Sequence, residues 1–313
     1  MFRLVAHRLL TSIPLILVVT FLTFFLNSLA PGDLARTLMQ GGGTEEQYQQ
    51  LRVEMSLDQP VLMQYWRWLS HALTGDLGVS FFTGERVSTL LNGRVGVTLT
   101  LMVGVLVVCV VAGLTLGIAS ALRGGFVGRA IDVLSMMGLI FPSFWVALVF
   151  IAIFAVWLGW FPATGYTPFR DNPWAWFIGM VLPVMSVALH SITNVAKQTR
   201  DSMIDVMGRD FIRALRAAGL SETSVVVKHA LRNAALPVVT VLGTIMVAAI
   251  GGAVFVERVF VLPGLGSLAV QAADQSDIAL LQGATLYFTL LTVAINLGVD
   301  LSYGWLNPKM RLT

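Results

Sequence analysis

The sequence has few charged residues for its length. Only 12% of the 313 residues are Asp, Glu, Lys or Arg, whereas 56% are hydrophobic. A soluble domain carries roughly 25% charged and about 45–50% apolar residues. Most of this chain must therefore face lipid or apolar neighbours. The net charge of +3 does not indicate nucleic-acid binding, because the basic residues stand between apolar runs, where they set membrane topology.

Residues for covalent or metal chemistry are also scarce. The single cysteine, Cys109, excludes an internal disulfide and a thiol pair for a metal. The four histidines form no ligand pair at i, i+4: His7, His71, His190 and His229. None of the three lysines follows a glycine, so the phosphate-binding Gly-Lys loop is absent. We expect a non-catalytic chain with no metal or cofactor of its own.

Long apolar runs, in contrast, are abundant. A helix crosses about 30 Å of hydrocarbon with about 20 apolar residues, because in lipid the backbone can hydrogen-bond only within its own helix. Six runs without Asp, Glu, Lys or Arg qualify: about Leu9–Pro31, Val95–Leu122, Val133–Trp160, Trp174–Ala196, Ala234–Phe255 and Ile278–Val299. The first exceeds the apolar core of a cleaved signal peptide, so we predict a retained anchor. The sequence predicts an all-α integral membrane protein with six transmembrane helices, residues 1–313 forming one domain.

The distribution of Lys and Arg predicts the orientation. Six spans put both termini on one side, and the segments on that side hold 13 of the 20 basic residues. Only 7 lie in the opposite loops, and five of those are in the long loop 32–94. The positive-inside rule therefore predicts cytoplasmic termini and a cytoplasmic segment 197–233, with the loops 32–94 and 256–277 outside.

The loop 32–94 carries helix signals of its own. Thr44 and Gln47 have the spacing of a capping box, and Asp58 and Pro60 open a second helix. That helix places apolar residues on one predicted face: Val61, Leu62, Tyr65, Trp66 and Leu69. We predict short interfacial helices in this loop.

The segment 197–233 is too charged to enter lipid and too regular for a plain connection. Apolar residues recur at helical spacing, which predicts an amphipathic helix: Ile204, Met207, Phe211, Leu215 and Ala218. Gly219 suits a left-handed C-cap, and Ser221 with Glu222 can start a second short helix. Two interpretations remain open: an amphipathic hairpin on anionic lipid, or a docking element that fits a cytoplasmic partner.

The residues of this segment also resemble a known loop. The runs Arg213-Ala214-Leu215-Arg216-Ala217-Ala218-Gly219-Leu220-Ser221-Glu222 and His229-Ala230-Leu231-Arg232-Asn233-Ala234-Ala235-Leu236-Pro237 resemble the signature loop of binding-protein-dependent ABC importer permeases, in the dipeptide/oligopeptide/nickel branch. Arg213 stands where the general signature begins with Glu. Arg232 stands where it has Pro. Both departures fit the peptide branch.

Shorter motifs extend the resemblance along nearly the whole chain, in the order of that branch. They are Pro31-Gly32-Asp33, Leu57-Asp58-Gln59-Pro60, Gly75-Asp76-Leu77-Gly78, Leu158-Gly159-Trp160-Phe161-Pro162, Glu257-Arg258-Val259-Phe260, Pro263-Gly264-Leu265-Gly266 and Asn307-Pro308. Each motif alone is weak, but seven in register with the loop and six spans are hard to obtain by chance.

The resemblance implies a type I ABC importer permease in the bacterial cytoplasmic membrane. It implies a second, similar permease subunit, two ATPase domains that hold ATP and Mg, and an extracytoplasmic solute-binding protein. The cargo would be dipeptides, oligopeptides or a related solute such as a nickel chelate or haem. The residues implied in ATPase coupling are Arg213, Ala214, Arg216, Ala217, Gly219, Leu220, Ser221 and Glu222.

Some functional assignments remain open at this stage. The loop 256–277 is a candidate contact for the binding protein or a gate, through Glu257, Pro263, Gly264 and Gly266. For Glu257 the alternative is capping of that loop. An ion-coupled carrier is the rival class and would normally place ionisable groups at mid-membrane, where only His190 is available.

Overall fold

The computed structural model describes residues 2–29, 39, 42, 44–54, 58–123, 125, 128, 130 and 141–306. Nearly all regular structure in these residues is helical, and one isolated antiparallel bridge joins Val79 and Arg86. The chain divides into two compact units. The first comprises Ala6–Gly96 and Pro263–Val293, and the second comprises Met1–Val5, Val97–Leu262 and Ala294–Thr313.

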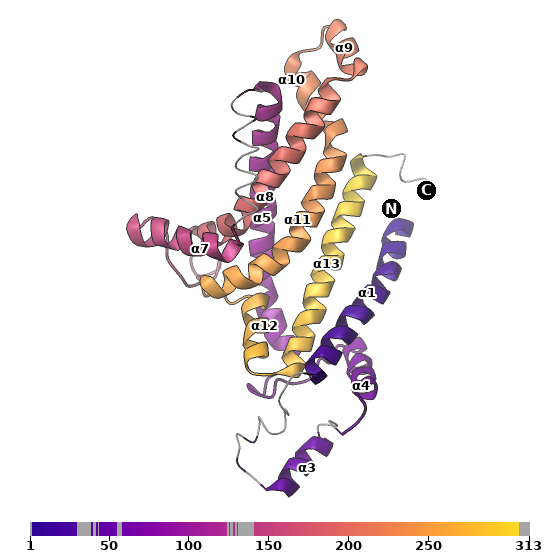
Figure 1. Cartoon of the computed structure of the whole chain (residues 1–313), viewed down its shortest axis with the longest axis vertical. Helices are drawn as coiled ribbons and strands as arrows, with labels where there is room; N and C mark the ends of the chain where they lie inside the picture. The colour runs from indigo at the N-terminus through magenta and orange to yellow at the C-terminus, as the bar shows by residue number, and fades with distance from the viewer. Residues whose placement is uncertain are drawn as a thin grey trace. The chain divides into compact units, whose positions relative to one another are not determined.

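Long helices dominate the structure (Figure 1). Among the described residues, five are long and apolar enough to cross a membrane: Val5–Leu29, Val87–Arg123, Pro173–Met207, Glu222–Val259 and Ile278–Leu306. A shorter apolar helix covers Ser143–Trp157. These are the predicted spans, and several extend well beyond the predicted apolar cores because a helix continues where polar residues replace apolar ones.

The third predicted span is only partly described. Its residues 133–140 lie outside the described residues, as do Pro31, Gly32, Asp33, Leu57, Asn307 and Pro308 of the shorter motifs. The described part is α7 (Ser143–Phe150), followed by a π-helical segment, Ile151–Trp157. Pro142, which falls inside the predicted range Val133–Trp160, stands at the N-cap of α7 with an extended backbone. Its missing N–H is no loss there, because the first helical turn has no intrahelical acceptor for it.

The first unit contains α1 (Phe2–Leu29), α3 (Glu45–Glu54), α4 (Val61–Leu73), α12 (Leu265–Asp274), the start of α5 (Val87–Arg123) and the first part of α13 (Ile278–Leu306). Its core joins α5, α12 and α13 through Leu91, Leu268 and Leu280. Gly283 permits this packing, since a Cβ there would lie 2.6 Å from Val87. The unit is thus held by close contact between helices far apart in sequence.

The helices of the loop 32–94 form as predicted, with one correction. Thr44 and Gln47 make the two reciprocal bonds of the capping box at α3, 2.9 and 3.3 Å long. On α4 the predicted apolar face is divided. Tyr65 is buried, with its hydroxyl 3.0 Å from Thr20 Oγ1, whereas Leu62 and Trp66 are 65% and 67% exposed. The inward face is set by contact with α1 rather than by apolar spacing alone.

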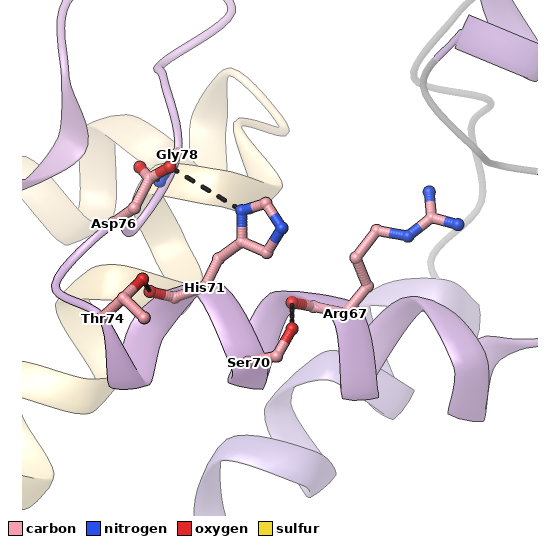
Figure 2. Close-up of polar contacts among 6 residues, drawn as sticks. All are labelled: Arg67, Ser70, His71, Thr74, Asp76 and Gly78. Carbon is pink, nitrogen blue, oxygen red and sulfur yellow. Dashed lines mark hydrogen bonds and ion pairs between the residues drawn. The ribbon is translucent and has the colours of Figure 1, made fainter.

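A tight turn follows α4 at the Gly75-Asp76-Leu77-Gly78 motif (Figure 2). Both glycines have φ of +87°, a conformation that side-chain-bearing residues rarely adopt. The Asp76 carboxylate accepts a 3.0 Å hydrogen bond from the backbone N–H of Gly78 and lies 3.7 Å from His71 Nδ1. The motif is therefore explained by the geometry of this turn.

The second unit contains the rest of α5, α7, α8 (Pro173–Met207), α9 (Asp210–Ala217), α10 (Glu222–Ser224), α11 (Leu231–Val259) and the end of α13. Glycines on α5 allow α8 to approach closely. A Cβ on Gly113 would lie 2.6 Å from Val195, and one on Gly117 would lie 2.5 Å from Thr199. Small residues at helix contacts are typical of membrane bundles, in which packing rather than the hydrophobic effect holds helices together.

Candidate functional site

The predicted coupling residues lie together in a hairpin between two membrane helices. We call residues 208–230 the α9 hairpin; it joins the end of α8 to the start of α11 (Figure 1). α8 ends at Met207. Gly208 and Arg209 are not helical, and α9 begins at Asp210. The single amphipathic helix predicted across this point is therefore wrong: it is two helices.

This break changes which residues point inward. The core of the hairpin consists of Met203, Val206, Ile212, Val225, Val226, Ala230 and Ala234. Of the predicted apolar face, Ile204 and Phe211 are instead exposed, at 47% and 37%, and Ala218 is exposed as well. Two non-helical residues alter the angular phase between the helices, so Ile212 rather than Phe211 meets the core.

Gly219 ends α9 as predicted, in a Schellman motif. Its φ is +79°, its N–H donates to the Arg216 carbonyl at 3.0 Å, and Leu220 N–H donates to the Leu215 carbonyl at 3.3 Å. Leu215 and Leu220 both pack against the hairpin core, which is the apolar contact that accompanies this motif. No atom lies within 4 Å of a Cβ built on Gly219, so its requirement is conformational, not steric.

Polar side chains then connect the two sides of the turn at Gly219, and we call the pair Arg216 and Glu222 the polar clamp. Ser221 caps the following helix, its Oγ accepting from Ser224 N–H at 3.4 Å. Arg216 donates two hydrogen bonds to the Glu222 carboxylate, 3.0 Å from Nε and 2.6 Å from Nη2. Donating these hydrogen bonds to the Glu222 carboxylate raises the pKa of Arg216 above its ordinary value. Both side chains are about half exposed, so solvent weakens the attraction.

The second helix is not a separate short element, which corrects the prediction. α10 continues through a π-helical segment, Val225–Ala230, directly into α11. The continuous apolar helix therefore runs from Glu222 to Val259. Single stretches of π-helix within α-helices are frequent at functional sites. α10 and the membrane-spanning part of α11 are thus parts of one continuous helix.

One exposed face of α9 is apolar, and apart from Phe211 its side chains are small. Phe211, Ala214 and Ala218 are exposed at i, i+3 and i+7, which is one helical face, and Ala217 beside them is exposed too. Charged side chains lie around this face but pair within the segment. The ion pairs are Arg200–Asp201, Arg209–Asp205, Arg213–Asp210 and Arg216–Glu222.

The predicted residues at the other end of α11 are buried. Glu257 lies in the last turn of α11 rather than just past it, is 0% exposed, and accepts a 2.6 Å hydrogen bond from Thr98 Oγ1. In the first unit, Gly264 is the N-cap of α12, and Gly264 and Gly266 are both buried, with Pro263 half-buried. The stretch predicted as a loop thus contains a ten-residue helix. Its contact with a binding protein stays a prediction.

Other titratable residues form no metal site in the described part of the chain, where no three His, Cys, Asp or Glu side chains cluster. His190, half-buried on α8, lies 3.2 Å from Asn194 Nδ2 through its Nε2 atom.

Two family matches cover most of the sequence. Residues 113–312 match the binding-protein-dependent transport system inner membrane component family, and residues 1–102 match its N-terminal region. The chain belongs to this family. As its members are inner-membrane transport components, the chain is a multi-pass membrane protein of a transport system.

Curated relatives agree over their whole lengths. A putative peptide transport system permease protein of Brucella abortus (strain 2308) is 40% identical over 312 residues, 99% of each chain. A probable peptide ABC transporter permease protein of Sinorhizobium fredii is 35% identical over 98% of each chain. The glutathione transport system permease protein GsiC of Salmonella paratyphi A is 37% identical over 99% of each chain.

A solved structure has the same fold. The MetNI methionine ABC transporter, in an inward-facing conformation, contains a chain that matches with a TM-score of 0.53 and 17% identity, covering 70% of this chain and 96% of that one. The predicted all-α permease architecture is confirmed.

Proposed function

We propose that this chain is the membrane-spanning subunit of an ATP-driven importer for peptides or a related small solute, and that the α9 hairpin couples it to separate ATPase subunits. The names of the relatives support peptides as the cargo class. Nothing supports the ion-coupled alternative: the six predicted spans carry no Asp, Glu, Lys or Arg, and the buried Glu257 accepts a hydrogen bond from Thr98.

The observation that carries the coupling role is the exposed small apolar face of α9. Phe211, Ala214 and Ala218 are turned away from the hairpin core, and small side chains allow another surface to approach the helix closely. A rigid Schellman turn at Gly219 holds this face at a set angle to α10. An exposed apolar helix face of this kind suits binding in a groove on another protein.

Charge argues against the alternative of a hairpin resting on anionic lipid. The segment 197–233 holds seven basic residues but also four acidic ones, giving a net charge of +3. All four acids pair with arginines of the same segment. Attraction to lipid scales with unpaired basic charge, at about 1 kcal/mol per residue near the surface, so this segment is a weak lipid anchor.

The assembly follows from this role. A second, similar permease subunit would complete the pathway, two ATPase domains with ATP and Mg would dock on the cytoplasmic hairpins, and a solute-binding protein would deliver cargo outside. This chain would carry no cofactor. The excess of Lys and Arg in the segments that include the hairpin supports a cytoplasmic location for both termini.

Replacement of Gly219 tests the coupling role. A β-branched residue is strained at φ of +79°, so Gly219→Val should redirect α10 and reduce solute uptake about tenfold or more, while membrane insertion and ATPase turnover persist. Gly219→Asn is the matched control, because Asn tolerates the left-handed conformation. It should retain most uptake.

The measurement is uptake, ATPase activity and subunit recovery in the reconstituted complex. Normal uptake by Gly219→Val would refute coupling through this turn. An equal loss of uptake in Gly219→Val and Gly219→Asn would show that any added side chain at this position, rather than the backbone conformation, disturbs coupling.

A further inference from the structure

One face of α8 changes from apolar to polar within the membrane-spanning helix. From His190 onward, polar residues recur along a stripe roughly 100° wide, at i, i+4, i+7, i+8 and i+11. The stripe consists of His190, Asn194, Lys197, Gln198 and Asp201. We call it the α8 polar track; it leads along α8 towards the α9 hairpin, which begins after Met207.

The α8 polar track faces away from the core of its own unit. On the opposite side of the helix Ile192, Val195, Thr199 and Met203 are buried, and Val195 and Thr199 contact the glycine positions of α5. The track residues are half-buried or exposed. The chain therefore builds its bundle on one side of α8 and leaves the polar side for another environment.

Hydrogen bonds within the track run along the helix. Asn194 Nδ2 lies 3.2 Å from His190 Nε2 and donates to the His190 carbonyl at 3.0 Å, and Gln198 Nε2 donates to Ser202 Oγ at 3.0 Å. Within the described residues, no hydrogen bond reaches the side-chain oxygens of Asn194 and Gln198. Each amide is thus oriented by its neighbour on the helix and keeps an acceptor for an outside partner.

Lipid is an unsuitable neighbour for this face. His190 and Asn194 lie within the span predicted from the sequence to end near Ala196, and a polar group without a partner in hydrocarbon costs several kcal/mol. Polar residues within spans face a bundle interior or a water-filled cavity. Lys197 and Asp201 continue the same face with charges of opposite sign, and these are best solvated by water.

We propose that the α8 polar track lines the half of the translocation pathway next to the α9 hairpin, where Asn194 and Gln198 offer amide groups to the peptide bonds of the passing solute. Amides donate and accept at once, so they match the backbone of any short peptide without selecting its side chains. This inference rests on the proposed importer function and assigns the pathway to particular residues of this chain.

Cysteine accessibility tests the assignment in membranes of the host strain, where the chain is present with its partner subunits. In a Cys109→Ala background, Asn194→Cys and Gln198→Cys would be exposed to a membrane-impermeant thiosulfonate in inverted vesicles. Leu189→Cys is the matched control: it lies next to His190, is 38% exposed, and points about 100° away from it. We expect at least tenfold faster labelling at 194 and 198 than at 189, slowed by a transported peptide.

Other outcomes would overturn the inference. No reaction of Asn194→Cys with either the thiosulfonate or a membrane-permeant maleimide would place the track in lipid or under a partner subunit, because a thiol kept from water stays protonated and unreactive. Labelling as expected in a complex that takes up no peptide would refute the proposed cargo but not the pathway. Normal peptide uptake without labelling would refute the pathway assignment alone.

Discussion

The two ends of the continuous helix from Glu222 to Val259 differ in how their charged side chains are surrounded. At the hairpin end, Arg216 and Glu222 form a close pair, but both side chains are about half exposed. At the far end, Glu257 is completely buried and held by Thr98 Oγ1 at 2.6 Å. One helix thus begins in a solvated clamp and ends in a buried carboxylate.

This difference indicates that the α9 hairpin is a surface suited to docking, whereas the contact between Thr98 and Glu257 fixes the far end of the helix in place. An exposed ion pair is screened by water and adds little to stability, so the shape of the α9 hairpin must come from its apolar core and its Schellman turn. A buried carboxylate is expensive without its donors, so the hydrogen bond from Thr98 restrains the far end strongly. The largest effects of substitution should therefore come from buried positions at either end.

The core of the hairpin should give the largest effect. Ile212 is completely buried, and Ile212→Ala should destabilise the hairpin by roughly 2–5 kcal/mol through lost burial and a cavity. Hydrogen exchange of the amides from Ile212 to Leu220 in the purified subunit would measure this. Phe211→Ala, one residue away on the exposed face, should leave exchange unchanged and lower only the ATPase-coupled uptake. Equal exchange in the two variants would contradict the inward position of Ile212.

The apolar pattern could predict that an amphipathic hairpin exists, but not which residues point inward. Gly219 and Ser221 act locally, and the left-handed turn at Gly219 and the helix start at Ser221 are predicted correctly, whereas their role in coupling stays a prediction. Phe211 was assigned to the wrong face because the break at Gly208 changes the helical phase. After the break, Ile212 shares a buried cluster with Met203 and Val206, and a periodicity of 3.6 residues continued across the break cannot reveal this contact.

Contacts between residues far apart in the chain likewise cannot be predicted from the sequence. Thr98 and Glu257 are 159 residues apart, and neither spacing nor composition connects them. The α8 polar track, in contrast, was available from the sequence as polar residues at i, i+4 and i+8. A search for ionisable groups points to His190 alone, because the other track residue within the predicted span, Asn194, is not ionisable. Burial of the opposite face is what distinguishes a pathway wall from scattered polar residues.

The buried end of α11 should give an intermediate effect. Thr98→Val keeps the shape of the side chain but removes the hydroxyl donor, leaving the Glu257 carboxylate short of a hydrogen bond. We expect a loss of about 1–3 kcal/mol in the free energy of unfolding, measured in detergent. Thr98→Ser retains the hydroxyl and should lose clearly less. If both variants lost the same amount, packing of the Thr98 methyl group rather than the hydrogen bond would restrain this end.

The exposed clamp at the other end should give the smallest effect. Glu222→Gln removes the charge that pairs with Arg216 but leaves an amide able to accept one of its hydrogen bonds, and the Leu215–Leu220 contact and the Gly219 turn remain. We expect unchanged thermal stability at low and high salt, because water already screens the pair. Hydrogen exchange of the hairpin should also be unchanged. Loss of uptake with unchanged exchange would mean that Glu222 contacts the ATPase directly, whereas faster exchange would mean that the clamp, and not only the apolar core, shapes the hairpin.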